Sequence, residues 1–250
     1  MYPPPAPTVP RPVMCQDWRT LTFLHWRYPP QTVQELLPAG LEVETFDGDA
    51  WVGLIPFLMD RVRAPRLPSL PWLSRFPETN VRTYVRGPDG RTGIWFFSLD
   101  AARLPAVLSG RLGYGLPYQW SAMSVRGAGG AIAYHSRRRW PGPPGAHCDA
   151  QIELGDPFPQ GELGPLDHFL TARFRLYSVF ADRLVAADAE HPPWPLRHAW
   201  LGHLRHNLIE VAGLPTPRGR PLMHASDGVR VRIGMWRPVR AAAQPAVEQG

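Results

Sequence analysis

The stretch that decides the fold is TNVRTYVRGPDGRTGIWFFSL, residues 79–99. Polar and apolar side chains alternate over residues 79–86, which is typical of a β-strand with two different faces. Gly87-Pro88-Asp89-Gly90 then supplies residues that favour a tight turn. A second run, rich in aromatic side chains, returns over residues 92–99. The stretch therefore predicts a β-hairpin.

The hairpin pattern recurs on both sides of this stretch. Further strands are expected at residues 19–26, 42–46, 50–59, 118–126, 131–136, 150–154, 174–180 and 229–236. Asp47-Gly48 and the glycine-rich run 127–130 favour tight turns between two pairs of them. Pro56 indicates a bulge or a sheet edge. Successive hairpins predict an antiparallel sheet that is curled closed, so that few edges remain.

Composition agrees with a sheet protein. The 250 residues include 31 prolines and 23 glycines, which argues against a helical bundle. Helices are expected only at residues 30–37, 103–112, 163–172 and 198–211. Asp100 is expected to cap the second of these helices. We therefore predict an α+β, mostly β protein with a few flanking helices and a single domain over residues 14–240.

The ends of the chain differ from this domain. Residues 1–13 are rich in proline and predict a disordered tail, and residues 241–250 predict a second one. The N-terminus lacks the basic start and apolar core of a signal peptide. Cys15 and Cys148 are far apart, which favours two reduced thiols. No apolar run approaches the roughly 18–20 residues that span a bilayer, so we expect a cytoplasmic protein with no membrane partner.

The basic residues are all arginines: the sequence has 27 of them, no lysine, and a formal net charge of +6. Without a side-chain amine the protein cannot form a lysine Schiff base with a carbonyl substrate or with pyridoxal phosphate. We expect no cofactor. Arginines bind phosphates and carboxylates, but their scattered positions favour a compositional bias over a nucleic-acid surface. The one dense run, Arg137–Arg139, is expected in a solvated loop.

The first strand of the quoted hairpin carries an unusual polar face. Glu78, Asn80, Arg82 and Tyr84 share one side because side chains alternate along a strand. Buried charges must be paired or functional. Three interpretations stay open. Glu78 and Arg82 form a structural ion pair, or they line a pocket in which Arg82 binds a carboxylate and Glu78 exchanges protons, or the row faces solvent.

Histidines supply further candidates. His25 lies in the middle of an expected strand, as a hydrogen-bonded core residue or as an acid–base group near neutral pH. Arg27 alternates with His25 and is expected to share its face. His203 and His206 lie three residues apart in the expected helix at 198–211. We interpret them as part of a polar helix face rather than a metal site.

Several motifs together resemble a known family. They are the runs Leu36–Leu41, Thr45–Gly53, Pro56-Phe57, Glu78–Val85, Phe96–Ala101, Leu116–Tyr118 and His191–Leu196. On these motifs, nearly all of residues 14–236 resembles the YqjF-like family of uncharacterised bacterial proteins. That family is similar to the acetoacetate decarboxylase-like superfamily, whose fold is a mostly antiparallel, cone-shaped closed sheet with a few outer helices. The resemblance implies the same fold here.

The resemblance also implies a site that lacks its reactive group. In acetoacetate decarboxylases a Gly-aromatic-Pro-Lys-Lys segment supplies the lysine that forms the Schiff base. The run Gly115-Leu116-Pro117-Tyr118-Gln119 corresponds to this segment, so Tyr118 and Gln119 stand where that superfamily has its two lysines. Glu78 corresponds to a glutamate on a neighbouring strand. The resemblance thus implies a retained cavity without amine catalysis.

These residues predict a small-molecule pocket for an organic acid or a carbonyl compound. The candidate catalytic groups, all for general acid–base chemistry, are Glu78, Tyr118 and His25. The candidate ligand-binding groups are Arg82, Asn80, Gln119 and Arg27. One alternative is a non-enzymatic binding or interaction protein, in which the charged face only stabilises the sheet. Nucleic-acid binding, motivated by the net positive charge, is the weaker alternative, and homo-oligomerisation stays open.

Overall fold

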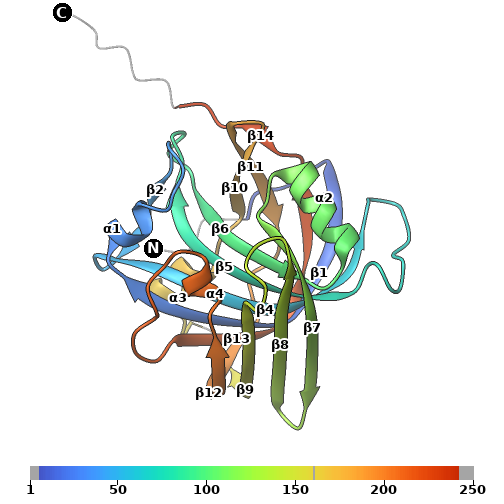
Figure 1. Cartoon of the computed structure of the whole chain (residues 1–250), viewed down its shortest axis with the longest axis vertical. Coiled ribbons are helices and arrows are strands. Elements are labelled where there is room, and N and C mark those ends of the chain that lie inside the picture. The colour runs from blue at the N-terminus through green and yellow to red at the C-terminus, as the bar shows by residue number, and fades with distance from the viewer. Residues whose placement is uncertain (1–5, 160, 242–250) are drawn as a thin grey trace, which may run out of the picture.

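The computed structural model describes residues 6–159 and 161–241 and arranges their strands in one large sheet (Figure 1). The strands are β1 (Pro12–Tyr28), β2 (Glu42–Val43), β3 (Thr45–Phe46), β4 (Asp49–Arg63), β5 (Phe76–Arg86), β6 (Thr92–Ala101), β7 (Tyr118–Ala128), β8 (Ala131–Trp140), β9 (His147–Pro157), β10 (Arg175–Phe180), β11 (Arg183–Glu190), β12 (Leu196–His206), β13 (Leu222–Gly234) and β14 (Arg237–Pro238). The helices are α1 (Pro30–Gln34), α2 (Leu104–Tyr114), α3 (Pro165–Thr171) and α4 (Leu208–Val211). The prediction of a mostly β protein with few helices is confirmed.

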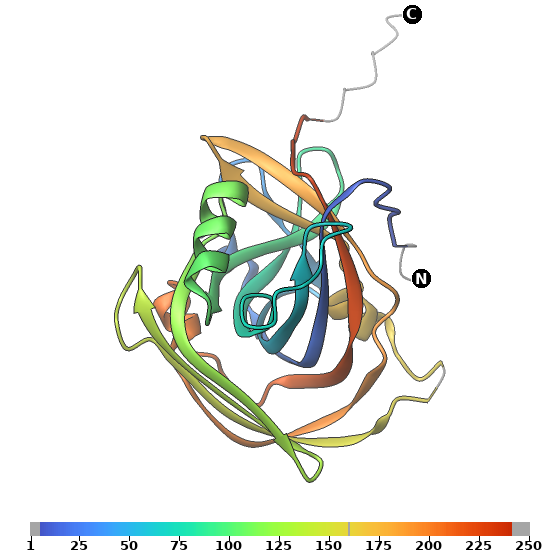
Figure 2. The same ribbon diagram turned by 90° about the vertical axis from the view of Figure 1, so that its right-hand side faces the viewer.

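The sheet closes on itself along two circuits that share a wall. Strands β13, β1, β4, β5 and β6 are neighbours in that order and form the shared wall. From β6, one path returns to β13 through β7, β8, β9 and β12, and the other returns through β10 and β11. Figure 2 shows how the strands curl round. Closure removes strand edges that would otherwise be free to pair with other chains.

Strand β6 lies where the antiparallel pattern breaks. It pairs in parallel with β7 and also with β10. Parallel neighbours need a crossover connection, and α2 supplies it between β6 and β7. This helix has Pro105 in its first turn and ends before Gly115, whose φ is 63°. The sheet is therefore mixed at these two joints rather than antiparallel throughout.

One of two local signals around β4, the Asp47-Gly48 turn, is confirmed. Asp47 and Gly48 both have positive φ, 52° and 82°, as a two-residue type I′ hairpin requires. Pro56 lies beside the point where the pairing of β4 with β1 slips by one residue, between Leu54 and Leu58. The extra residue belongs to β1, in which Thr20 has a φ of 49°, so the bulge lies in the strand opposite Pro56 and not at Pro56 itself.

The two circuits enclose different interiors. On β4, Val52 and Leu54 pack in an apolar core with side chains from β8, β9 and α4. Ile55 and Phe57 pack on the other side of the strand, with side chains from β13 and α2. Because successive side chains of a strand point to opposite faces, the shared wall contributes to both interiors. The candidate site lies in the second one.

The helix expected at residues 198–211 is wrong for most of its length. Residues 196–206 form β12, and only the short α4 that follows is helical. The pairing of β12 with β9 slips between Leu201 and His203, which marks a bulge at Gly202. Because of the extra residue, Leu201 and Leu204 pack into the same core although they are three residues apart. A spacing of three is also typical of one face of a helix, which explains the wrong prediction. His203 and His206 therefore lie on a strand and share no helix face.

The arginine run also differs from its prediction. Arg137, Arg138 and Arg139 belong to β8 rather than to a solvated loop. Arg138 is buried, and it donates from Nε to Asp100 Oδ1 at 2.9 Å and from Nη2 to Asp100 Oδ2 at 2.7 Å. Asp100 thus does not cap α2, whose N-cap residue is Arg103. The two charges are buried together because each compensates the other.

The N-terminal segment joins the fold earlier than expected. Val9 is buried, its N–H donates to Glu190 Oε2 at 2.6 Å, and β1 begins at Pro12. Residues 9–13 of the expected tail are therefore part of the fold. Residues 1–5 and 242–250 lie outside the described residues. No helix within the described part of the chain is long and apolar enough to cross a membrane.

Candidate functional site

A cavity of about 160 Å³ lies inside the circuit formed by the shared wall, β10 and β11. One face of α2 covers it, with Ala106, Ser109 and Gly110 at the cavity wall. Most of the lining is apolar. The larger polar side chains of the lining are Gln16, Glu78, Asn80, Arg82, Tyr118, Arg173, Arg175 and His191. A concave, mostly apolar hollow with a few polar groups is typical of a small-molecule site.

Glu78 is a buried carboxyl at the cavity wall. The Tyr118 hydroxyl donates a hydrogen bond to Glu78 Oε2 at 3.1 Å. Burial raises the pKa of Glu78 to about 8; hydrogen bonds with Tyr118 and Asn80 oppose this rise, and the negative charge of Asp100 adds to it. Burial likewise raises the pKa of Tyr118 well above its ordinary value. Near neutral pH Glu78 thus holds a proton that it is able to exchange.

The connection between α2 and β7 places Tyr118 beside Glu78. Gly115 ends α2 in the left-handed region, and a Cβ there would lie 2.2 Å from the Val179 oxygen, so only glycine fits. β7 then begins at Tyr118, which pairs with Leu99 of β6. The Tyr118 ring lies against Gly110, where a Cβ would come within 2.3 Å of it. Two glycines therefore make room for this tyrosine at the cavity wall.

Arg82 is the other charged group on this strand, and it is 7% exposed. Its Nη2 donates to the Leu170 oxygen at 3.3 Å, and its guanidinium carbon lies 5.5 Å from the centre of the Phe23 ring. Its Nε has no hydrogen-bond partner, and no carboxylate within residues 6–159 and 161–241 forms an ion pair with it. Arginine stays charged in proteins. A buried positive charge is thus left uncompensated at the cavity wall.

The structural ion pair between Glu78 and Arg82 does not form. The two residues are four apart on β5, about 13 Å between Cα atoms at the rise of a strand, and Asn80 lies between them. All three are buried and line the same cavity, so the row does not face solvent either. Of the three interpretations of this face, a polar pocket is the one that the placement fits.

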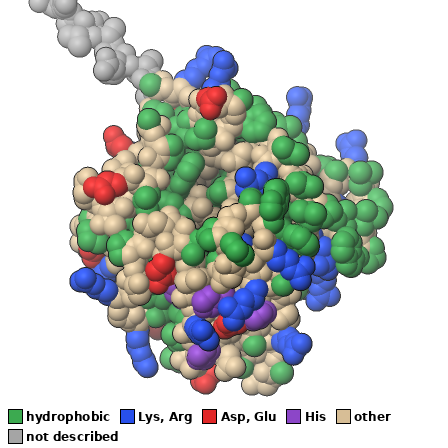
Figure 3. Space-filling model, in the orientation of Figure 1, with side chains coloured by type: hydrophobic (Ala, Val, Ile, Leu, Met, Phe, Trp, Pro, Cys, Tyr) green, Lys and Arg blue, Asp and Glu red, His purple; other side chains and the backbone are tan. Residues whose placement is uncertain are grey.

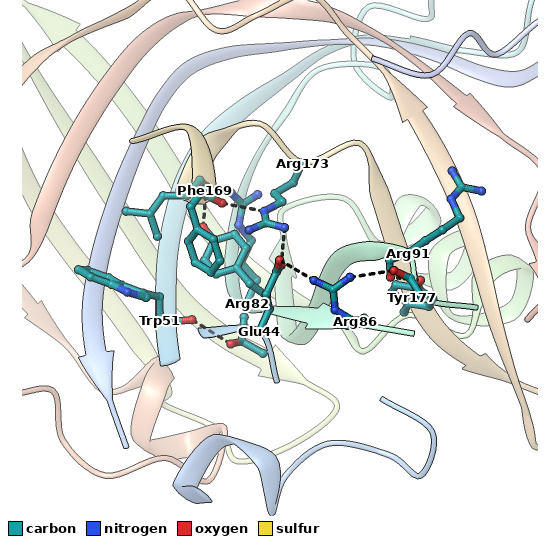
Figure 4. Close-up of polar contacts among 12 residues, drawn as sticks. Glu44, Trp51, Arg82, Arg86, Arg91, Phe169, Arg173 and Tyr177 are labelled. Carbon is teal, nitrogen blue, oxygen red and sulfur yellow. Dashed lines mark hydrogen bonds and ion pairs between the residues drawn. The ribbon is translucent and has the colours of Figure 1, made fainter. Parts of the chain in front are cut away.

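Arg173 lines the cavity although sequence reasoning did not select it. It donates from Nε to the Phe169 oxygen at 2.7 Å and pairs with Glu44 at 2.5 Å (Figure 4). Arg86 approaches the other Glu44 oxygen at 3.5 Å. Burial lowers the pKa of Arg173; the negative charge of Glu44 opposes this, and the positive charge of Arg82 adds to it. Two guanidinium groups therefore share the Glu44 carboxylate on this side of the cavity, and Arg82 has no part in that pairing.

Arg175 and His191 are two further cavity residues that were not predicted. Arg175 pairs with Asp89 at 2.9 Å, so its charge is compensated. The ring nitrogens of His191 lie 2.8 Å and 3.3 Å from the oxygens of Pro192 and Arg173, and burial lowers its pKa. Arg173 and Arg175 are two residues apart and adjoin a strand-like run. This spacing could have indicated that both side chains lie on one face of a strand. His191 begins the motif His191–Leu196, which carries the family resemblance but gives this histidine no role in a site.

His25 lies behind the cavity wall rather than at it. The ring is buried, and Nε2 is 2.6 Å from the Tyr84 hydroxyl oxygen. That hydroxyl donates its proton to the Leu170 oxygen at 2.6 Å, so the His25 Nε2–H must be the donor in the contact with Tyr84. Burial, with the nearby charges of Arg82 and His224, lowers the pKa of His25 well below its ordinary value. The geometry is that of a hydrogen-bonded core histidine.

Arg27 and Gln119 also lie outside the cavity lining. Arg27 is exposed and pairs with Asp49 at 3.3 Å. It does not share the environment of His25 because β1 extends past the end of its pairing with β13 at this point. Gln119 points away from Tyr118 and donates to the Pro117 oxygen at 3.4 Å. Within the described residues, no three His, Cys, Asp or Glu side chains are grouped so as to hold a metal ion.

Comparison with known proteins places the site in a family context. Residues 15–230 match the family model of DUF2071, an uncharacterized conserved protein. The uncharacterized protein YqjF of Bacillus subtilis strain 168 is 36% identical over 212 residues, which is 85% of this chain and 86% of that protein. The resemblance drawn from the sequence motifs is confirmed.

Solved structures of low sequence identity share the fold. The enduracididine biosynthesis enzyme MppR, complexed with pyruvate, has a TM-score of 0.64 and 15% identity, covering 96% of this chain and 99% of its own. An acetoacetate decarboxylase-like enzyme from Sphingomonas wittichii RW1 has a TM-score of 0.64 and 14% identity, covering 96% and 100%. Acetoacetate decarboxylase from Legionella pneumophila has a TM-score of 0.62 and 12% identity, covering 96% and 92%. The predicted acetoacetate decarboxylase-like fold is thus confirmed.

Proposed function

This chain belongs to the DUF2071 family, and we propose that it binds a small organic acid that carries a carbonyl group in the cavity of its acetoacetate decarboxylase-like fold. Arg82 binds the carboxylate of this ligand. The apolar wall holds the carbon chain, and Glu78 with Tyr118 meets the carbonyl oxygen. Any reaction proceeds by general acid–base chemistry, without a covalent amine intermediate.

The uncompensated charge of Arg82 is the observation that supports this proposal most. Burial of an unpaired ion costs several kcal/mol, so a buried charge without a partner calls for a ligand of opposite charge. The Arg82 Nε–H has no acceptor within the described residues, and a ligand carboxylate would supply one together with the opposite charge. Glu44 does not serve this purpose because Arg173 and Arg86 already share it.

Glu78 and Tyr118 supply the chemistry in this proposal. A carboxyl with a pKa of about 8 is protonated at neutral pH and donates its proton to the carbonyl oxygen of the ligand. In its ionised form it removes a proton from the carbon next to that carbonyl, and the electron pair moves to the oxygen. The Tyr118 hydroxyl stabilises the ionised form because it donates to Oε2. The sequence has no lysine, so a lysine Schiff base plays no part.

Binding without turnover is the second candidate function. The missing lysines favour it, because they remove the amine chemistry while the cavity is kept. A structural neighbour has been solved in complex with pyruvate, a small oxo acid, and this supports the ligand class for either candidate.

Thermal unfolding with a panel of oxo acids and matched neutral ketones tests the ligand class. A ligand at 100 times its Kd stabilises the fold by about 2.7 kcal/mol, which is about 5–10 °C in Tm for a chain of this size. We expect such a shift with oxo acids for the unaltered protein and none for Arg82→Met. Arg27→Met and Gln119→Ala, outside the cavity, are controls that keep the shift. A stable Arg82→Met protein that retains the shift contradicts the proposal.

Proton exchange distinguishes the two candidate functions. NMR in D2O follows replacement of the ligand hydrogens next to its carbonyl by deuterium. If Glu78 is a catalyst, Glu78→Gln slows this exchange by about 10²–10⁴-fold while the ligand-induced shift in Tm remains. If the unaltered protein does not accelerate exchange although it binds, binding without turnover is the function.

A further inference from the structure

Exposed large apolar side chains gather on one side of the molecule, next to the cavity. Within the described residues ten such side chains are exposed. Six of the ten come from the loop between β4 and β5, from α2 and from the end of β8: Leu67, Leu70, Trp72, Leu108, Leu112 and Trp140. We refer to these six residues as the α2 surface. Exposed apolar side chains that gather on one surface of a folded protein indicate an interaction site.

Contacts across the surface show that it is continuous. Arg103, at the start of α2, donates from Nε to the Trp72 oxygen at 2.9 Å and lies 4.5 Å from the Trp72 ring centre. Arg111, further along the helix, lies 5.9 Å from the Trp140 ring centre. Figure 3 shows hydrophobic side chains gathered on the right of the molecule, with arginine side chains around them. The loop, the helix and the strand end therefore form one surface.

The charge of these segments differs from that of the rest of the chain. Residues 61–75, 103–114 and 137–145 contain nine arginines and no acidic residue. The other 18 arginines of the sequence are outnumbered by its 21 acidic residues. Three of the nine pair with carboxylates. The six that form no ion pair within the described residues are Arg63, Arg66, Arg75, Arg103, Arg111 and Arg139. The α2 surface is thus apolar and ringed by unpaired positive charge.

We propose that the α2 surface docks on the face of an anionic lipid bilayer. Tryptophan and leucine insert at the boundary of the acyl chains, and arginines around them meet lipid phosphates. A symmetric contact with a second copy would bring the unpaired arginines of both copies together. A nucleic acid would use the arginines and leave Leu67, Leu70 and Leu112 in water. A negatively charged bilayer satisfies both features.

Docking in this way places the lipid over the cover of the cavity. Leu108 and Leu112 lie on the outer side of α2, whereas Ala106, Ser109 and Gly110 of the same helix line the cavity. The sequence led us to expect no membrane partner because no segment is long enough to span a bilayer. Peripheral docking needs only an exposed surface, and here the fold forms that surface from segments that are distant in the sequence. The inference is independent of the ligand proposed for the cavity.

Vesicle flotation of the full chain tests the proposal. The probes are vesicles of phosphatidylcholine alone and of equimolar phosphatidylcholine and phosphatidylglycerol. We expect binding to the anionic vesicles that is reduced at least tenfold without phosphatidylglycerol or at high salt. We expect each of two double variants, Leu70→Ser/Trp72→Ser and Arg66→Glu/Arg75→Glu, to lower the partition constant at least tenfold. For the arginine variant the reason is that each basic residue near the surface contributes about fivefold.

Control variants with unchanged thermal unfolding make the result specific. Trp200→Ser and Arg183→Glu change an exposed tryptophan and an exposed arginine that lie outside these segments, and we expect binding within twofold of the unaltered protein. Equal binding by the α2-surface variants overturns the proposal. It is also overturned if only the arginine variant loses binding and DNA retention falls with it. Loss of a dimer in light scattering, without an effect on flotation, assigns the surface to a second copy instead.

Discussion

Glu78 keeps its proton in the folded chain over a pH range in which the unfolded chain has released it. Burial raises its folded pKa from an ordinary 4.5 to about 8. Between these two values the unfolded state binds fewer protons, so this group lowers stability as pH rises from about 4.5 to about 8, and its effect is constant outside that window. Glu78→Gln removes the titration, while the amide still accepts from Tyr118.

We therefore expect the stability of Glu78→Gln relative to the unaltered protein to grow through this window by on the order of a few kcal/mol. Urea unfolding at pH 5, 7 and 9 measures the difference. Glu153→Gln, at an exposed position of β9, is the matched control and should show no such trend. A constant difference between Glu78→Gln and the unaltered protein from pH 5 to pH 9 would mean that Glu78 is ionised throughout.

The part of the candidate site that lies on a single strand could be predicted from the sequence. Glu78, Asn80 and Arg82 share a face because of the period of a strand, and no knowledge of the rest of the fold is needed. Arg173 and His191 lie in connections beside β10 and β11, so their positions depend on how those strands join the circuit. Arg27 has the same parity as His25, but only the length of the neighbouring strand shows that it is exposed.

At the scale of elements, a buried ion pair connects strands across the parallel joint. Asp100 at the end of β6 accepts from Arg138 of β8 and from Ser121 Oγ of β7 at 2.6 Å. Asp100→Ala leaves the Arg138 guanidinium buried without a partner, and this costs about 3–5 kcal/mol. Equilibrium unfolding measures the loss. Asp100→Leu/Arg138→Met removes both charges and is expected to recover most of the stability. If the double variant is no more stable than Asp100→Ala, desolvated charge is not the cause.

Elements held by local contacts are the ones that the sequence predicts well. The hairpins β3–β4 and β5–β6 follow from alternation and from turn residues close in sequence. The strand β12 was mistaken for a helix because a bulge at Gly202 changes the spacing of its buried leucines. The parallel joints of β6 are set by the path of α2 and by the return of β10 from a distant part of the chain. Neither has a local signal.

At the scale of the whole molecule, the shared wall separates a packed core from the cavity. Each of its strands alternates between the two, so neighbouring residues have different roles. This arrangement explains how a chain with a large apolar interior also keeps charged groups such as Arg82 buried. Packing in the circuit that contains β7, β8, β9 and β12 holds the wall in place. The polar groups of the circuit that contains β10 and β11 lie on the same wall, so fixing their positions requires little additional loss of conformational entropy.

Leu54 and Ile55 are adjacent residues of β4 that test this separation. Both are almost fully buried, but Leu54 packs in the core of the first circuit, whereas Ile55 lines the cavity. Each change to alanine removes buried methyl groups and is expected to cost about 2–5 kcal/mol in unfolding free energy. Only Ile55→Ala also changes the cavity, so only this variant should alter the Kd of a bound oxo acid. Calorimetric titration at a temperature where both variants are folded measures the two values of Kd. Equal effects on affinity would show that the two interiors do not act separately.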